Sequence, residues 1–294
     1  MMQAFLDIFD IYLLEAAING ILFGGVLALL ALGLNLIFGV IDVTWICYAE
    51  LIMIGMYGMY YLVSVYGVPY WVAAPMCILL VAGLGALLHF LVIAPLLSSP
   101  PINQLLATGG VLFFLQSAAT VAFGIEFHNI GIQLPVLRFG EMNFSYARLL
   151  SFAAALIGMV SVYVFMKRTY TGTAIRAIAQ DRQIMALMGV DTRRIYLITS
   201  ALGGALAGLA ACLLVLLYDV HPFIGLSIGP ITFLVCVLGG LGNFVGGFVA
   251  AFVFAQIISL GGMFSDLEWG YVLAFGFFIV MMFIRPAGLL SRRQ

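Results

Sequence analysis

Charged side chains are scarce in this sequence: Lys, Arg, Asp and Glu together make up 8% of its 294 residues. An ordinary soluble domain carries roughly 25%. Hydrophobic residues reach 65%, and they dominate nearly every window of about 20 residues between Glu15 and Ile284. This composition excludes a soluble globular protein and predicts a single membrane domain that covers residues 1–294.

Several kinds of site are missing from the sequence. The net charge of −1 leaves no basic surface for nucleic acid. No G-x-x-x-x-G-K-[ST] loop is present to hold nucleotide phosphates, so we expect this chain to bind no ATP itself. The histidines His89, His128 and His221 are isolated, without a paired acid and base or a metal set. We therefore predict neither catalytic residues nor a metal site.

Cysteine and early basic residues are also sparse. The four cysteines lie far apart inside apolar runs without a C-x-x-C pair, and we expect all of them to pack as small apolar side chains. They are Cys47, Cys77, Cys212 and Cys236. The first Lys or Arg is Arg138, so no cleavable signal peptide is predicted and the first hydrophobic segment should be retained.

The hydrophobic segments predict an all-α, polytopic transmembrane bundle with eight or nine crossings, because only internally bonded backbone is stable in lipid. They lie at about 15–35, 47–65, 70–94, 104–124, 146–166, 195–217, 228–240, 243–261 and 270–285. Two assignments are open: residues 228–240 are short for a full span, and residues 37–46 are a possible re-entrant piece.

The basic residues predict how the bundle is oriented, since Lys and Arg near span ends stay in the cytoplasm. Six of the 11 lie within residues 167–194, and Arg285, Arg292 and Arg293 mark the C-terminal end. The N-terminus is therefore predicted outside and the C-terminus in the cytoplasm. Residues 124–146 then form the longest external loop. Residues 239–243 form a tight cytoplasmic turn.

Glycine is abundant, at 33 residues, and three pairs have the G-x-x-x-G spacing that lets helices pack closely. The pairs are Gly20/Gly24, Gly204/Gly208 and Gly242/Gly246. We interpret them mainly as helix packing within one subunit, with a subunit interface or a pathway lining as alternatives.

The cytoplasmic segment 167–194 contains a predicted short helix outside the bilayer. Asp181 is a suitable N-cap, and Gly189 can end the helix in the left-handed conformation. Its apolar residues Ile184, Met185, Leu187 and Met188 are too many for a solvated helix of two turns. We predict that it docks into a cleft on a cytoplasmic partner. The alternative is an amphipathic helix that rests on lipid headgroups.

Three blocks of sequence resemble the permeases of branched-chain amino-acid (Liv-type) ABC importers. The first is G-L-N-L-I-F-G-V at residues 33–40, followed by Glu50 and a G-x-Y pattern at 55–57. The second is G-T-A-I-R-A at 172–177, continuing through Asp181 to M-G-V at 188–190. The third is G-G-L-G-N at 239–243 with Gly246 and Gly247. Together with length and hydrophobic pattern they cover nearly the whole chain.

This resemblance implies a permease subunit in a bacterial cytoplasmic (inner) membrane that moves branched-chain amino acids or a related amino acid or amide. It implies a second permease, homologous or identical, and an extracytoplasmic solute-binding protein. Two ATP-binding subunits would hold ATP and Mg, while this chain binds no cofactor and contacts lipid. The coupling residues would be Gly172, Arg176, Asp181, Ile184, Met185, Leu187, Met188 and Gly189.

A second group of residues is predicted to border a pathway or gate: Asn35, Trp45, Tyr48, Glu50, Gly239, Gly240, Gly242 and Asn243. Where many family members resemble N-F-A-H-G-E, this chain has W-I-C-Y-A-E at residues 45–50, which keeps the carboxylate and changes its neighbours. The simplest interpretation of Glu50 is a carboxylate bonded to a helix end near the membrane face. Its alternative is a position beside the pathway.

The rival functions are an ion-coupled secondary transporter and a channel. A secondary transporter usually keeps carboxylates or a proton-relay histidine well inside its spans, whereas the carboxylates here fall near predicted span ends. His89 does lie inside a long apolar run, and we expect it to be a hydrogen-bonded packing residue. No ring-forming acidic motif or filter repeat favours a channel.

Overall fold

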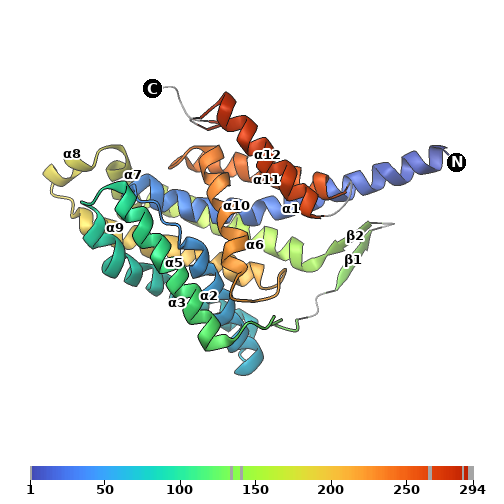
Figure 1. The fold of residues 1–294 in the computed structure, drawn as a ribbon, viewed down its shortest axis with the longest axis horizontal. Helices are drawn as coiled ribbons and strands as arrows, with labels where there is room; N and C mark the ends of the chain where they lie inside the picture. The colour runs from blue at the N-terminus through green and yellow to red at the C-terminus, as the bar shows by residue number, and fades with distance from the viewer. Residues whose placement is uncertain (1, 133–134, 140–141, 264–266, 287, 291–294) are drawn as a thin grey trace.

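The computed structural model describes residues 2–132, 135–139, 142–263, 267–286 and 288–290. These residues form a helical bundle with one small antiparallel hairpin (Figure 1). The elements are α1 (Met2–Ile41), α2 (Tyr48–Tyr60), a π-helical turn (Tyr61–Val65), α3 (Tyr70–Leu88), a second π-helical turn (His89–Ile93), α4 (Ala94–Leu96), α5 (Pro101–Phe123), β1 (Val136–Phe139), β2 (Met142–Ser145), α6 (Tyr146–Arg168), α7 (Tyr170–Gln180), α8 (Arg182–Leu187), α9 (Thr192–Leu214), α10 (Ile224–Gly239), α11 (Phe244–Met263) and α12 (Leu267–Ile284).

The all-α membrane fold is confirmed, and each predicted hydrophobic segment coincides with a helix. Seven of the described helices are long and apolar enough to cross a bilayer, while α10 and α12 are shorter apolar helices. The β1–β2 hairpin, which pairs Val136 with Ser145, was not predicted; it lies inside the expected external loop. The number of crossings and the side that each terminus faces stay predictions.

The connection between α1 and α2 enters the bundle instead of lying at its surface. Helix α1 continues to Ile41 and ends at Asp42, whose φ of 60° is in the left-handed region. Thr108 donates a hydrogen bond to the Thr44 carbonyl over 2.9 Å. Since Thr108 is seven residues into α5, this contact lies about 10 Å along that helix. The possible re-entrant piece is therefore helical up to Ile41, and residues 42–47 alone fold inward.

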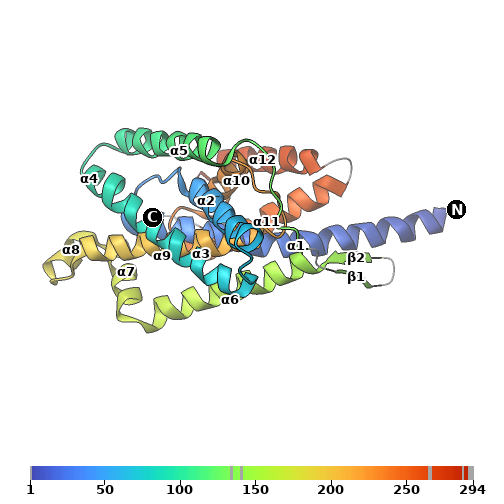
Figure 2. The same ribbon diagram turned by 90° about the horizontal axis from the view of Figure 1, so that it is seen from below.

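Helix α1 lies at the centre of the bundle and packs against α6, α9, α10 and α11. Both ribbon views place α7 and α8 at the end of the molecule opposite the N-terminus and the hairpin (Figures 1 and 2). The structure therefore separates the basic segment 167–194 from the loop between α5 and α6, as the predicted topology requires. This separation does not assign either end to the cytoplasm.

Two of the three glycine pairs pack helices together within this chain. A Cβ on Gly204 would lie 2.6 Å from the Val81 carbonyl oxygen, and one on Gly208 would lie 2.9 Å from Ile78 Cα, so α9 crosses α3 at close range. Gly20 and Gly24 face α11 in the same way. Gly242 and Gly246 also make close contacts within this chain, with Gly39 of α1 and Gly239 of α10, but Gly242 lies in the turn before α11 and not on that helix.

Polar and thiol groups inside the spans are accommodated by packing and hydrogen bonding. His89 Nδ1 lies at hydrogen-bond distance, 2.9 Å, from the Ser200 hydroxyl, which confirms its interpretation as a bonded packing residue. All four cysteines are free and buried. Three of them, Cys77, Cys212 and Cys236, donate to backbone carbonyls, those of Gly55, Ala74 and Ala31.

Candidate functional site

The segment between α6 and α9 forms two helices where one was predicted. Helix α7 begins at a Thr169 N-cap, whose hydroxyl accepts from the Gly172 N–H over 3.0 Å. Gly172 allows a sharp turn, because a Cβ there would collide with the backbone of Met166. Ile175 and Ile178 anchor α7 in the core, while Arg176 remains exposed. Thr169 was the signal for this helix that the sequence analysis missed.

Helix α8 has the predicted caps. The Asp181 carboxylate accepts from the backbone N–H groups of Gln183 and Ile184, both at 2.9 Å. Gly189 has a φ of 82°, in the left-handed region that favours glycine. Both predictions about the ends of this helix are confirmed.

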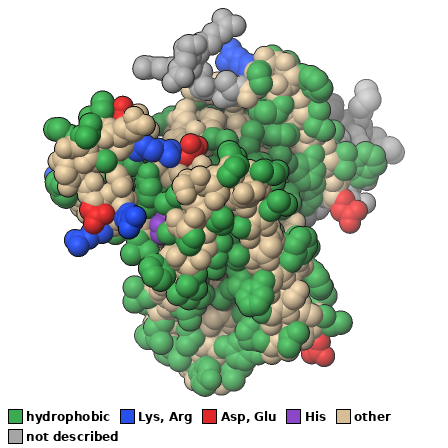
Figure 3. Space-filling model, turned by 60° about the vertical axis from the view of Figure 1, so that its left-hand side comes forward, with side chains coloured by type: hydrophobic (Ala, Val, Ile, Leu, Met, Phe, Trp, Pro, Cys, Tyr) green, Lys and Arg blue, Asp and Glu red, His purple; other side chains and the backbone are tan. Residues whose placement is uncertain are grey.

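The apolar residues of α8 divide into one anchor and one exposed face. Met185 is half-buried and packs against the core. Ile184, Leu187 and Met188 are 57%, 87% and 76% exposed. In Figure 3, basic and acidic side chains gather on the lobe formed by α7 and α8, whereas most of the remaining visible face is hydrophobic. This apolar face, with its charged surroundings, is an uncovered surface of the chain.

An ion pair links α8 to the inward-folding connection. Arg182 lies 3.2 Å from Asp42, and both side chains are at least half exposed. Exposed pairs of this kind contribute little stability, roughly 0–1 kcal/mol. The ion pair matters because of where it lies: Asp42 directly precedes the residues that lead to Trp45 and Glu50.

Five of the predicted gate residues meet where α1 crosses the turn between α10 and α11. Asn35 accepts from the Gly242 N–H over 3.1 Å, and Gly242 has a φ of 78°. Gly239 backs directly onto Gly246 and Gly247, so any side chain there would collide with α11. Asn243 caps α11 by accepting from Gly246. These residues, with Gly240 between them, form a tightly packed turn.

The other three predicted residues lie at or just before the start of α2 and are all buried: Trp45, Tyr48 and Glu50. The Tyr48 hydroxyl lies against Gly33 of α1, and the Glu50 carboxylate lies against Gly225 of α10. The interpretation of Glu50 as a bonded carboxylate is wrong. Neither of its oxygens has a hydrogen-bond partner among the described residues, because the first turn of α2 lies inside the bundle and faces glycine.

A groove of about 840 Å³ lies on the other side of α10 and contains none of the predicted gate residues. Its walls come from α1, the end of α9, α10 and α12 and are mostly aliphatic or aromatic. They include Leu27, Leu30, Leu214, Ile224, Ile228, Ile231 and Phe275. Pro230, inside α10, also lines the groove. A proline within an apolar segment was the signal that could have directed attention to this helix.

Polar groups line the rim of this groove at the connection between α9 and α10 and at the start of α12. Asp219, His221 and Glu268 line it. Asn129 donates to Asp219 over 2.7 Å, and the backbones of His128 and Val220 pair with each other, which fixes the α5–α6 loop to this rim. Burial lowers the pKa of His221, an effect that nearby Asp219 partly offsets.

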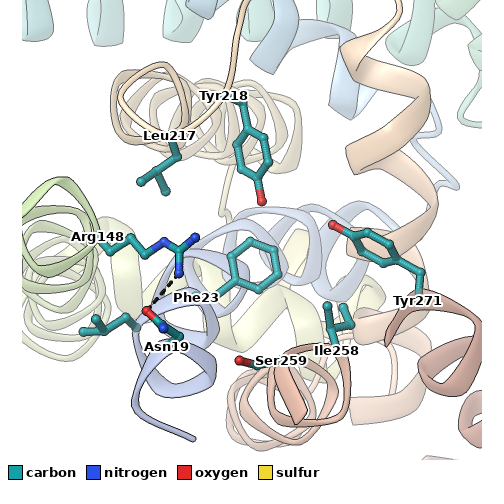
Figure 4. Close-up of a pocket in the computed structure, with 9 residues that line it drawn as sticks. Asn19, Phe23, Arg148, Leu217, Tyr218, Ile258, Ser259 and Tyr271 are labelled. Atoms are coloured by element: carbon teal, nitrogen blue, oxygen red, sulfur yellow. Dashed lines mark hydrogen bonds between the residues drawn. The ribbon is translucent and has the colours of Figure 1, made fainter. Parts of the chain in front are cut away.

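A second, smaller pocket of about 150 Å³ adjoins the groove and shares Phe23, Tyr218 and Tyr271 with it. Figure 4 shows Arg148 reaching into this pocket from α6, with both tyrosine hydroxyls directed toward its interior. Arg148 donates to the Asn19 side-chain oxygen over 2.8 Å. Sequence reasoning did not single out this pocket, because its residues are spread across five parts of the chain.

Comparisons with known proteins identify relatives of this chain. The family described as "Branched-chain amino acid transport system / permease component" matches residues 16–282. The permease protein BraD of a high-affinity branched-chain amino acid transport system from Pseudomonas aeruginosa is 29% identical, over 96% of each chain. LivH of Escherichia coli, from a system of the same description, is 26% identical over 97% of each chain.

Two further relatives extend the comparison. LivM of Escherichia coli, named as a permease of a high-affinity branched-chain amino acid transport system, is 25% identical over 89% of this chain and 67% of its own. A chain of the solved PsaBC structure from Streptococcus pneumoniae, in complex with Fab, superposes with a TM-score of 0.53 over 98% of this chain and 97% of its own. At 14% identity, that similarity shows the fold alone.

Family and fold together make this a multi-pass protein of the cytoplasmic (inner) membrane that serves transport. The chain belongs to the family of branched-chain amino acid transport system permease components.

Proposed function

We propose that this chain is the translocating subunit of an ATP-driven importer for branched-chain amino acids, and that the solute passes through the groove beside α10. The groove is the observation that carries the proposal. Its volume of about 840 Å³ lies within the range of roughly 300–1,000 Å³ typical of small-molecule sites. Aliphatic walls suit a branched side chain, and the polar rim at Asp219, His221 and Glu268 suits a zwitterionic head group.

The first half of α10 is the proposed gate. One face of this segment lines the groove, and the opposite face presents Gly225 and Gly229 to Glu50 and Ala49 of α2. Pro230 has no N–H to donate to the Leu226 carbonyl, so the helix is weakened at the end of this segment. Movement of the segment would connect the groove with Glu50.

The buried Glu50 carboxylate supports such a movement. A charged group without a partner is disfavoured in a protein interior by several kcal/mol. In this closed arrangement, Glu50 is fully buried with both oxygens unpartnered. An open state would hydrate the carboxylate or give it the ammonium group of a passing amino acid. Glu50 is thus proposed as a pathway residue that is accessible in only part of the transport cycle.

The exposed face of α8 is the proposed docking site for an ATP-binding subunit. Ile184, Leu187 and Met188 project from the chain and would be covered by an apolar cleft. Two such subunits would bind ATP and Mg, while a second permease and an extracytoplasmic solute-binding protein would complete the importer. This assignment places residues 167–194 in the cytoplasm and the α5–α6 loop outside. Relatives named LivH and LivM in one organism support the second permease.

Uptake by cells tests the proposal. A strain that lacks this chain should lose uptake of labelled leucine and regain it with a plasmid copy of the chain. Excess unlabelled isoleucine or valine should suppress the restored uptake, whereas excess glutamate should not. Leucine uptake that is unchanged by the deletion, with no other amino acid affected, would rule the proposal out.

A further inference from the structure

The small pocket beside the groove combines a cation with several neutral polar groups. Asn19 contributes from α1, Arg148 from α6, Ser259 from α11 and Tyr271 from α12, while Tyr218 comes from the α9–α10 connection. Figure 4 shows these side chains converging around one space. Arg148 supplies its positive charge.

Arg148 remains exposed, yet its side chain extends toward α1 and this pocket from near the start of a spanning helix. An arginine at such a position often extends toward lipid headgroups. Here the guanidinium donates one hydrogen bond to Asn19, a neutral amide on the neighbouring helix. A guanidinium has five N–H groups, so donors remain for an anionic ligand.

The wall opposite Arg148 is held in place by hydrogen bonds between α11 and α1. Ser259 donates to the Ala16 carbonyl over 2.6 Å, and Gln256 donates to the Ala17 carbonyl over 2.9 Å. These bonds join the two helices directly beside Asn19. The pocket is thus fixed on two of its sides before any ligand binds.

Size and position indicate the ligand. A volume of about 150 Å³ accommodates a small anionic group but not a whole amino acid with a branched side chain. Phe23, Tyr218 and Tyr271 form walls of both this pocket and the groove of about 840 Å³. The two spaces are therefore neighbours, and a molecule with an anionic head and an apolar body would reach from one to the other past these shared side chains.

We propose that Arg148 and Asn19 bind the carboxylate of the transported amino acid while its aliphatic side chain lies in the adjoining groove. This inference rests on the proposed function, from which it takes the groove as the solute's route. Carboxylate recognition at this position would orient the solute, with its ammonium group directed toward the acidic rim. The site assigns a specificity role to Arg148: ligands that lack a carboxylate should be rejected.

Calorimetric titration of the purified full-length chain in phosphatidylcholine nanodiscs tests the inference. Wild-type protein should bind leucine and isocaproate, which both carry the carboxylate, and should bind isoamylamine, which lacks it, far more weakly. Arg148→Gln should lower the binding affinity for leucine and for isocaproate roughly 10- to 100-fold, the range expected for loss of a charge-assisted hydrogen bond. Asn19→Ala should weaken both to a smaller extent. Arg168→Gln, in the exposed last turn of the same helix as Arg148, is the matched control and should change neither.

Three results would overturn the assignment. The first is equal binding of leucine and isoamylamine by the wild type, which requires no variant and so does not depend on variant folding. The second is unchanged leucine affinity in Arg148→Gln. The third is an Arg148→Gln variant that loses binding of phosphatidylglycerol but keeps binding of leucine, which would identify the ligand as a lipid phosphate. Wild-type protein that binds no leucine and supports no uptake would instead contradict the proposed function.

Discussion

At the scale of single residues, two glycines decide how closely α10 approaches its neighbours. Gly242 has a positive φ, and a Cβ there would lie 2.9 Å from Gly39 Cα. Gly225 leaves room for the Glu50 carboxylate, which a Cβ at this position would meet. In both places the restriction comes from a contact between segments far apart in the sequence.

Gly242→Val is expected to reduce the amount of folded protein. The left-handed backbone alone costs a non-glycine residue roughly 1–2 kcal/mol, and the collision with Gly39 adds to it. Thermal unfolding, monitored by size-exclusion chromatography, should show a lower midpoint temperature for the variant than for the wild type. Gly83→Val, at a helical position where an added Cβ meets nothing within 4 Å, is the control and should behave nearly as wild type. A wild-type midpoint for Gly242→Val would show that the turn is not restricted.

Gly225→Ala should destabilise the closed arrangement of α2 and α10, because its methyl group would occupy the place of the Glu50 carboxylate. Overpacking of this kind typically costs 1–3 kcal/mol. Glu50→Ala added to the same chain removes the colliding group and should restore much of the thermal midpoint. Gly225→Ala without effect, or a double variant less stable than Gly225→Ala alone, would contradict the contact and with it the proposed gate.

At the scale of elements, α8 was the most fully predicted part of the site. Asp181 and Gly189 specify its ends through local hydrogen bonding and backbone conformation, and both are evident in sequence. Its neighbour α7 was missed. The reason is physical: α7 is held by burial against α1, α6 and α9, which no local pattern shows, and its local signal is the Thr169 N-cap.

Leu187→Glu should separate docking from folding. Leu187 is 87% exposed, so a charge there is harmless in the isolated chain, but it would be buried without a partner in an apolar cleft at a cost of several kcal/mol. The variant should reach normal abundance, yet an ATP-binding subunit should no longer co-purify with it. Gln183→Glu adds the same charge to a polar position of the same helix and should retain the subunit. Normal co-purification of Leu187→Glu would leave α8 as a lipid-surface element.

At the scale of the whole molecule, hydrophobic pattern and turn residues were enough to predict the fold. Every predicted segment is helical, because a backbone segment in lipid must satisfy its own N–H and C=O groups by internal hydrogen bonds. The groove and the Arg148 pocket were not predictable in the same way. Phe23, Arg148, Tyr218 and Tyr271 come from four distant segments, and no local rule relates them. Glu50 was found in sequence, but its lack of a partner depends on Gly225, 175 residues away.

Sidedness of the whole molecule is open to direct labelling. The four native cysteines are buried, so introduced cysteines should dominate modification by a membrane-impermeant maleimide. In intact cells, Glu126→Cys in the α5–α6 loop should be labelled and Gln183→Cys in α8 should not; after permeabilisation both should react. Labelling of Gln183→Cys alone in intact cells would invert the proposed topology.

The central claim is that ATP held by a partner subunit drives solute movement through this chain, and accumulation in proteoliposomes measures it most directly. The complete transporter, with solute-binding protein outside and ATP inside, should concentrate labelled leucine above its external level. A non-hydrolysable ATP analogue should abolish this accumulation, and a proton ionophore should leave it intact. Accumulation that proceeds without ATP and collapses with the ionophore would contradict the account and identify an ion-coupled transporter.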